Sequence, residues 1–204
     1  MRHCPNRDFA LILAAGFSTR MGICKTSLPW HDNRTLLRYQ AEQFLQTGIT
    51  PIIVLGSHNA QRQVDCPDGS RVVINECSQN GKTSSILTGL QLLPQHFSSV
   101  IISAVDQPRS LCIYQSLLQT YRQKQALIVA PCHRGKLGHP LLFSDRLLPE
   151  LKNITEASLG LRRVVNKFYN AIAKVEFSTS EVISDLNTRD RYQLELSKYQ
   201  VAKS

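Results

Sequence analysis

The sequence predicts an α/β fold of three layers, in which helices cover both faces of a mainly parallel β-sheet. Short apolar segments alternate with longer amphipathic segments along most of the 204 residues. The short segments are continuous apolar runs, which are typical of parallel strands buried on both faces of a sheet. A chain of this length can form one substantial core, so residues 1–204 are expected to form a single domain.

Turn signals bound the elements of the first half. Segment 9–15, FALILAA, is short, apolar and ended by Gly16, as expected of a buried strand. In segment 35–48 apolar residues recur at helical spacing, and Thr35 and Gly48 are placed to cap its start and its end. The strands expected here are 9–15, 51–56, 71–75 and 99–105, and the helices are 35–48 and 84–94.

The second half continues the alternation less regularly. Segment 112–123 predicts a helix and segment 126–131 a strand. GHPLLF, at 138–143, predicts a short strand entered through a turn. Further helices are expected at 144–151, 159–168 and 189–199, and a further strand at 171–177.

The composition favours an anionic ligand but indicates no particular one. Lys and Arg number 24 against 15 Asp and Glu, which gives a net charge of +9. The basic residues are scattered, and Arg162–Arg163 is the only adjacent pair. Because no stretch interleaves aromatic and basic residues, a nucleic acid is not the expected partner.

The cysteine pattern and the hydropathy of the chain indicate the cellular compartment in which the protein is expected. The six cysteines include no C-x-x-C pair, so zinc spacing is absent and free thiols in a reducing cytoplasm are expected. No apolar run approaches the roughly 20 residues of a membrane span. Arg2 and Arg7 before FALILAAG give some likeness to a secretory signal, but Asp8 interrupts it. We therefore expect a cytoplasmic protein without a membrane partner.

The loop after segment 9–15 combines small and basic residues, GFSTRMGICKTS at 16–27. Small residues let the backbone approach a ligand, and successive N–H groups in a bend bind anions. Arg20 and Lys25 add full charges, which together suit a triphosphate. The spacing matches neither G-x-x-x-x-G-K-[ST] nor G-x-G-x-x-G. The alternative is an ordinary loop whose basic residues are solvated.

A second polar segment, DQP at 106–108, directly follows segment 99–105. In open α/β sheets, ligands bind beyond the carboxyl ends of the strands. If segments 9–15 and 99–105 are neighbours, Asp106 shares one cleft with the basic loop. The alternative is that Asp106 only caps the helix that follows.

Five motifs in this order resemble those of the MobA-like nucleotidyltransferases. They are LAAGFSTRMGICKTSLPW (13–30), NGKTSSILTGLQLLP (80–94), AVDQP (104–108), IVAPCHRGKLGHPLLF (128–143) and ISDLNTRDRYQ (183–193). Within that family the chain is most similar to the MocA-type molybdenum cofactor cytidylyltransferases. The resemblance implies a Rossmann-like, GT-A-like nucleotidyltransferase fold.

The implied reaction transfers a nucleotidyl group, CMP from CTP, to the phosphate of a molybdopterin-type acceptor and releases pyrophosphate. Mg²⁺ would neutralise the meeting anions, and a molybdoenzyme could receive the product. Two alternatives stay open: transfer to a sugar or alditol phosphate, and a non-catalytic chaperone of the same fold that holds a cofactor.

The resemblance also implies roles for individual residues. The triphosphate would be held by Gly16, Arg20 and Lys25, and the base bordered by Ala14 and Ala15. Ser84 and Ser85, with Gly81, would line the nucleoside pocket, although either serine could instead cap the helix. The metal would be held by Asp106 and Asn187, with Asp185 as the alternative to Asn187. The acceptor side would comprise Gly138, His139, Pro140 and Arg162.

In three motifs the chain departs from the family pattern. Val105 replaces the glycine before the metal-binding aspartate, Ser158 replaces an aspartate, and GKTSS replaces GMSSS, which adds Lys82 to the cleft. These departures concern the acceptor side more than the nucleotide side.

Overall fold

The computed structural model describes residues 8–18 and 21–201. Within them, eight strands form one sheet in the order β3-β2-β1-β4-β7-β5-β6, and β8 also pairs with β5. The strands are β1 (Asp8–Leu13), β2 (Thr50–Gly56), β3 (Arg71–Asn75), β4 (Ser99–Ala104), β5 (Ile128–His133), β6 (Lys136–Leu137), β7 (Leu141–Ser144) and β8 (Ile172–Glu176).

The sheet is mainly parallel, as predicted. β1 lies parallel between β2 and β4, β3 is parallel to β2, and β8 is parallel to β5. β7 is antiparallel to both β4 and β5, and β6 is antiparallel to β5. The reversal follows from a tight turn after β5, where Arg134 and Gly135 have positive φ, because a hairpin cannot supply the long crossover of a parallel pair.

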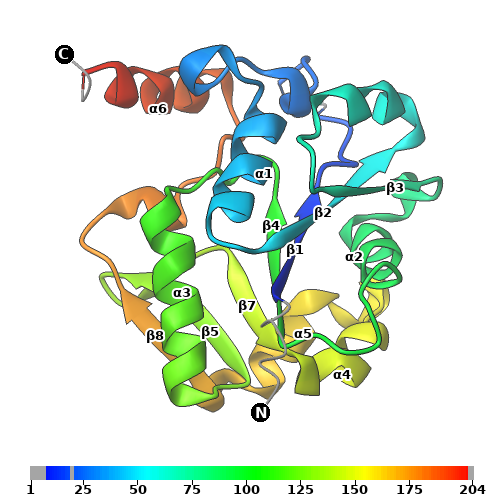
Figure 1. Cartoon of the computed structure of the whole chain (residues 1–204), viewed down its shortest axis with the longest axis vertical. Helices are drawn as coiled ribbons and strands as arrows, with labels where there is room; N and C mark the ends of the chain where they lie inside the picture. Colours follow the sequence, from blue (N-terminus) through cyan, green and yellow to red (C-terminus); the bar gives the residue numbers. More distant parts are fainter. Residues whose placement is uncertain (1–7, 19–20, 202–204) are drawn as a thin grey trace.

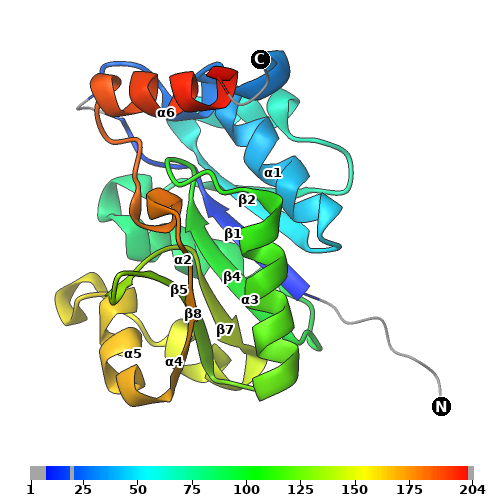
Figure 2. The ribbon, with the colours of Figure 1, turned by 90° about the vertical axis from the view of Figure 1, so that its left-hand side faces the viewer.

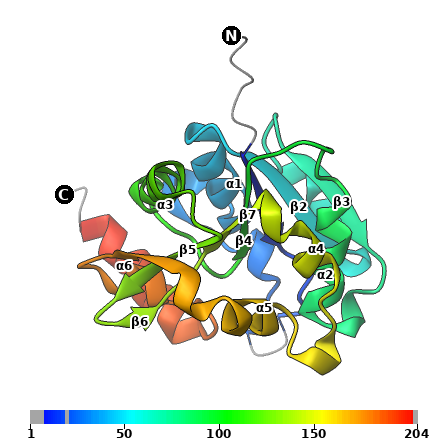
Figure 3. The same cartoon turned by 90° about the horizontal axis from the view of Figure 1, so that it is seen from below.

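Helices cover both faces of the sheet, which confirms the three predicted layers (Figures 1, 2 and 3). One face carries α1 (Leu36–Gln46) and α3 (Leu111–Lys124). The other carries α2 (Lys82–Leu90), α4 (Leu148–Lys152) and α5 (Leu161–Lys167). The last helix, α6 (Arg189–Val201), packs through Tyr192 and Leu196 against a cluster that includes Leu36 and Tyr39 at the start of α1.

Alternation along β1 explains why every residue that follows Asp8 in this strand is apolar. Leu11 and Leu13 belong to the core under α2, whereas Ile12 and Ala14 belong to the core under α1 and α3. Every residue of β1 is buried, because both faces of the sheet are covered.

Element bounds differ from the predictions mostly at the ends. Thr35 accepts a hydrogen bond from the Arg38 N–H, which confirms it as the cap of α1. Helix α2 begins two residues before the serines that predict its start and ends at Leu90, well before Pro94. Short 3-10 helices, which periodicity does not predict, span Lys25–Ser27, His31–Asn33, Ser57–Asp65, Ser78–Asn80, Asp145–Leu147, Glu156–Ser158, Tyr169–Ala171 and Ser180–Ile183.

Two further expectations concern thiols and membranes. Five cysteines of the described residues, Cys24, Cys66, Cys77, Cys112 and Cys132, are free thiols, as expected, and Cys4 lies outside them. None of the helices between residues 8 and 201, outside the gap at 19–20, is long and apolar enough to cross a membrane.

Candidate active site

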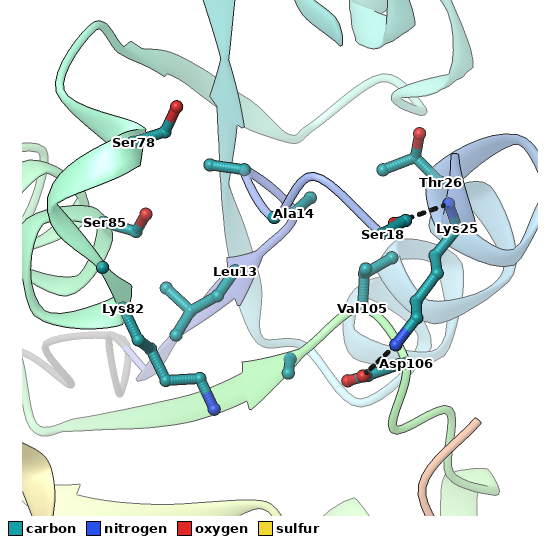
Figure 4. A pocket seen from close by; sticks show the side chains of 14 residues that line it. Leu13, Ala14, Ser18, Lys25, Thr26, Ser78, Lys82, Ser85, Val105 and Asp106 are labelled. Atoms are coloured by element: carbon teal, nitrogen blue, oxygen red, sulfur yellow. Dashed lines mark hydrogen bonds and ion pairs between the residues drawn. The ribbon is translucent and has the colours of Figure 1, made fainter. Parts of the chain in front are cut away.

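A cleft opens at the carboxyl ends of β1 and β4, where the sequence predicts a ligand site. Its first compartment is a cavity of about 270 Å³ (Figure 4). The end of β1 and the turn after β4 form one side, and the start of α2 forms the other. Its lining includes the predicted residues Ala14, Ala15, Gly16, Lys25, Gly81, Ser85 and Asp106.

A second, more polar compartment of about 560 Å³ adjoins the first. Ser18, Lys25, Lys82 and Asp106 line both compartments. The others that line it are Gln107, Arg162, Asp185 and Asn187. The cleft therefore joins an apolar, small-residue compartment to one lined by charges and amides.

The start of the loop after β1 is fixed by hydrogen bonds of Asn59, whereas the backbone at Gly16 is open toward the cavity. The buried side chain of Asn59 donates from Nδ2 to the Ala14 carbonyl at 2.9 Å, and its Oδ1 accepts from the Gly56 N–H at 2.8 Å. A Cβ built on Gly16 would meet nothing within 4 Å. Packing therefore does not require glycine at position 16, and its bare backbone faces the cavity. Arg20, predicted to bind the triphosphate, lies outside the described residues.

Lys25 brings the two predicted metal ligands together. Its Nζ donates to Asp106 Oδ2 at 2.7 Å and to Asn187 Oδ1 at 2.9 Å. The side chains of Lys25 and Asp106 are 13% and 18% exposed, so this cluster is largely shielded but open to the cleft. Asp106 lies 81 positions after Lys25 in the sequence and Asn187 lies 162 positions after it, yet both contact the same ammonium.

Asp185 lies in the same compartment but has other partners. Its Oδ1 accepts from Gln107 Nε2 at 2.9 Å and lies 3.9 Å from Arg109 Nη2. The neighbouring Leu186 N–H donates to the Asp106 carbonyl at 2.8 Å, which fixes the segment beside the end of β4. Asn187, rather than Asp185, therefore shares the Lys25 ammonium with Asp106.

Neither predicted serine is the N-cap of α2. The cap is Gly81, and the carboxylate of Glu156 accepts the Thr83 N–H at 2.7 Å in place of a capping side chain. Ser84 Oγ donates to the Gly81 carbonyl at 2.9 Å, so it is bonded within the loop and is not part of the cavity lining. Ser85 does line the cavity, and its Oγ accepts from the buried Asn75 side chain at 3.0 Å.

The predicted acceptor residues separate into two groups. Arg162 lines the polar compartment, whereas Gly138, His139 and Pro140 are not among the residues lining either one. A Cβ on Gly138 would lie 2.3 Å from the Val182 carbonyl oxygen, so this glycine permits close backbone packing. His139 is exposed, and partial desolvation together with the Lys82 charge lowers its pKa.

Arg109 is a buried residue beside the cleft that sequence reasoning missed, and its Nη2 lies 3.9 Å from Asp185 Oδ1. It is 1% exposed, and its guanidinium donates to the carbonyls of His139 at 3.0 Å and Pro108 at 2.9 Å. Burial lowers its pKa. The adjacent DQP motif is the only sequence signal near Arg109. A single sequence does not distinguish a buried arginine from an exposed one, and most arginines are exposed.

Comparisons with known proteins find relatives along most of the chain. The model of the MobA-like NTP transferase domain matches residues 10–174. The molybdenum cofactor cytidylyltransferase of Escherichia coli K12 is 25% identical over 197 residues, covering 93% of this chain and 95% of that protein. The nicotine blue oxidoreductase of Paenarthrobacter nicotinovorans is 24% identical over 188 residues, covering 87% and 91%.

Solved structures show the same fold at lower identity. Rv0371c from Mycobacterium tuberculosis H37Rv superposes with a TM-score of 0.81 at 22% identity, over 94% of this chain and 98% of that one. Its manganese complex gives a TM-score of 0.75 at 21% identity, over 94% and 98%. The CMP:2-keto-3-deoxy-manno-octonic acid synthetase complexed with CTP gives 0.72 at 14% identity, over 97% and 99%.

The family match covers most of the chain, including the loop after β1, the start of α2 and the turn that carries Asp106. These segments border the cleft from both sides. The chain therefore belongs to the MobA-like NTP transferase family and is a nucleotidyltransferase.

Proposed function

We propose that this protein transfers CMP from CTP to the phosphate of a molybdopterin-type acceptor and releases pyrophosphate. The observation that carries the proposal is the convergence of Lys25, Asp106 and Asn187 where the two compartments meet. A reaction between two phosphate groups needs charge neutralisation at the point where the nucleotide and the acceptor touch.

The nucleotide would occupy the small-residue compartment. Ala14 and Ala15 would border the base, and Ser85 would face the nucleoside from the start of α2. Gly16 leaves its backbone bare for the phosphates, and Lys25 would bind them with its ammonium. Arg20, from the same loop, is proposed to share this role.

Asp106 and Asn187 would hold a divalent cation. Their carboxylate and amide oxygens lie within hydrogen-bond distance of one ammonium, so both can face a single cation, and such oxygens suit Mg²⁺. The Rv0371c structure in complex with manganese supports a divalent metal in this fold. When bound, the ion would stabilise the charge that develops on the transferring phosphoryl group. Asp185 would serve instead as a partner of Gln107.

The acceptor would enter through the polar compartment, which Lys82 and Arg162 line together with Asp106 and Asn187. These two cations have no carboxylate partner among the ion pairs of the described residues. They would attract an anionic phosphate and orient it for in-line attack. A phosphate nucleophile needs no general base, so His139, outside the cleft lining, is assigned no proton transfer.

The acceptor distinguishes this proposal from its alternatives. A sugar or alditol phosphate would use the same cations, and the oxidoreductase relative shows that a redox reaction is also named among similar proteins. The lining of Lys82, Arg162, Asp106 and Asn187 is suited to phosphate chemistry. Residues 1–204 would form one cytoplasmic domain, and the product of the reaction would pass to a molybdoenzyme.

The decisive experiment measures pyrophosphate release. Purified protein is incubated with each of the four NTPs and Mg²⁺, with molybdopterin, a sugar phosphate, an alditol phosphate or no acceptor. We expect release only with CTP and molybdopterin together, and a higher melting temperature with CTP·Mg²⁺ than with the other NTPs. Release with a sugar or alditol phosphate alone would reassign the acceptor, and no release from any pair would overturn the proposal.

A further inference from the structure

We infer that the Lys25 ammonium occupies the cation position between Asp106 and Asn187 until a nucleotide arrives, so that free metal is excluded and the metal binds together with the triphosphate. This inference rests on the proposed function, in which Asp106 and Asn187 are the metal ligands. It adds an order of binding and assigns that order to one side chain.

The contacts of Lys25 show why free metal would bind poorly. Its Nζ uses the Asp106 Oδ2 oxygen at 2.7 Å and the Asn187 Oδ1 oxygen at 2.9 Å. A divalent cation entering beside the ammonium would find both oxygens taken and would meet a positive charge a few ångströms away. The ammonium must therefore leave before the two oxygens can bind a metal.

The two oxygens alone are a poor metal site. Mg²⁺ and Mn²⁺ need about six oxygen ligands, and here the protein offers one carboxylate and one amide. No group of three or more His, Cys, Asp or Glu side chains suited to a metal occurs in the part of the chain that the structure describes. Phosphate oxygens and waters would have to complete the shell, so metal affinity depends on the nucleotide.

A triphosphate supplies the force that moves Lys25. Its side chain lines both compartments, and its backbone N–H is anchored to Ser18 Oγ at 3.2 Å, so the long side chain can turn while its base stays fixed. A triphosphate carries several negative charges against the single one of Asp106, and it accepts strong charge-assisted hydrogen bonds. The nucleotide would therefore draw the ammonium away as its own phosphates bring the metal.

The test measures Mn²⁺ binding without nucleotide, by electron paramagnetic resonance. Three proteins are compared: wild type, Lys25→Met and Lys82→Met. Lys82 is the matched control, because it lines the same two compartments but is not a hydrogen-bond partner of Asp106 or Asn187. If the ammonium occupies the site in nine molecules of ten, removing it raises the Mn²⁺ affinity about tenfold.

We expect this tightening in Lys25→Met and at most a small change in Lys82→Met. Equal tightening in both variants would show a general effect of charge, and no tightening in Lys25→Met would show that the ammonium does not compete; either result overturns the inference. Circular dichroism checks that each variant is folded, and Lys25→Gln replaces Lys25→Met if the latter is not.

A second arm separates this inference from the metal assignment. Mn²⁺ binding is repeated with a CTP analogue whose α–β bridging oxygen is replaced by CH₂, in wild type and in Asp106→Ala. If Asp106→Ala leaves Mn²⁺ binding to the nucleotide complex unchanged, the proposed metal site is wrong. If Asp106→Ala weakens it and Lys25→Met does not tighten binding of free Mn²⁺, the metal site stands and only the role of Lys25 is wrong.

Discussion

The guanidinium of Arg109 donates from Nε to the carbonyl oxygen of His139, 3.0 Å away and 30 residues along the chain. The same side chain binds the carbonyls of Pro108 and Val182. One buried cation thus ties the turn after β4 to the GHP segment and to the 3-10 helix Ser180–Ile183. The position of Asp106 relative to the GHP segment, residues 138–140, therefore depends on Arg109.

Replacing Arg109 with leucine is expected to destabilise the fold. The carbonyl oxygens of Pro108 and His139 would lose the Arg109 donor, whereas the Val182 carbonyl would keep the His139 N–H at 2.8 Å, and each unsatisfied group costs about 1–3 kcal/mol. We expect a loss of about 2–5 kcal/mol in the free energy of unfolding, measured by urea denaturation. Arg122→Leu is the control, since Arg122 is half-exposed and pairs with Asp8 at the amino end of β1, far from the cleft. A loss no larger in Arg109→Leu than in Arg122→Leu would contradict the role given to Arg109.

This arginine also shows where prediction from one sequence stops. The order of strands and helices follows from periodicity and turn signals, because each is a local property of the chain. The reversed direction of β7 does not follow, since it depends on a tight turn at Arg134–Gly135 that leaves no crossover. Burial of Arg109 likewise depends on the carbonyls of three separate segments, which no local pattern reveals.

The residues that line the candidate site are easier to predict than the residues that hold the lining segments in place. Asp106 and the loop containing Lys25 each follow a strand, so the topology brings them together once β1 and β4 are neighbours. Asn59 and Glu156, which hold the Ala14 carbonyl and the start of α2, give no such signal. Their partners are 45 and 73 residues away, and polar residues of this kind are common in surface loops.

Asp106→Ala is expected to abolish turnover while the fold stays intact. Asp106 is partly exposed at the end of β4, so its loss leaves no buried cavity, but it removes a proposed metal ligand. The loss of several kcal/mol of transition-state stabilisation should lower kcat/KM at least about 100-fold. Initial rates of pyrophosphate release measure the effect, and the melting temperature checks the fold. Turnover above about a tenth of wild type would remove Asp106 from the metal site.

Two glycine substitutions should separate binding from stability. Gly16→Ala adds a methyl group that meets no protein atom within 4 Å, at a residue that lines the cavity, so CTP affinity should fall about tenfold or more without loss of stability. Gly138→Ala brings a methyl group 2.3 Å from the Val182 carbonyl oxygen and should lower the unfolding free energy by about 1–3 kcal/mol. Calorimetry with CTP and urea denaturation measure the two effects. Unchanged CTP affinity in Gly16→Ala would place the nucleotide elsewhere.

The pKa of His139 depends on the positive charge of Lys82. Desolvation is the larger cause that lowers this pKa, and the positive charge of Lys82 lowers it further. Lys82→Met should therefore raise the pKa of His139 toward 6.5, as followed by NMR titration of the imidazole Cε1 proton. Since the folded-state pKa lies below the unfolded one, stability falls as the pH drops from 6.5 toward the folded pKa. Lys82→Met should make that fall smaller, and an unmoved titration curve would show that Lys82 does not act on His139.

Asn187→Asp tests which residue completes the proposed metal site. Asn187 offers a neutral oxygen beside Asp106, so an aspartate there would add one negative charge to the ligands. Ligand charge is a main determinant of affinity for a hard cation, and the Mg²⁺ concentration for half-maximal rate should fall. The maximal rate need not rise, because the added charge also repels the triphosphate. Asn187→Leu, which removes the oxygen, should be far worse than Asn187→Asp.

Asp185→Asn is the matched control, because it changes one charge two residues away in the same compartment. Asp185 Oδ1 already accepts from Gln107 at 2.9 Å, and an asparagine can keep that bond through its carbonyl oxygen. We therefore expect a smaller shift in the Mg²⁺ curve than Asn187→Asp produces, and in the opposite direction, because a negative charge is lost. Titration of Mg²⁺ against the initial rate in both variants gives the comparison. A curve that is unmoved in Asn187→Asp and strongly displaced in Asp185→Asn would transfer the metal to Asp185 and leave Asn187 as a hydrogen-bond partner of Lys25 alone.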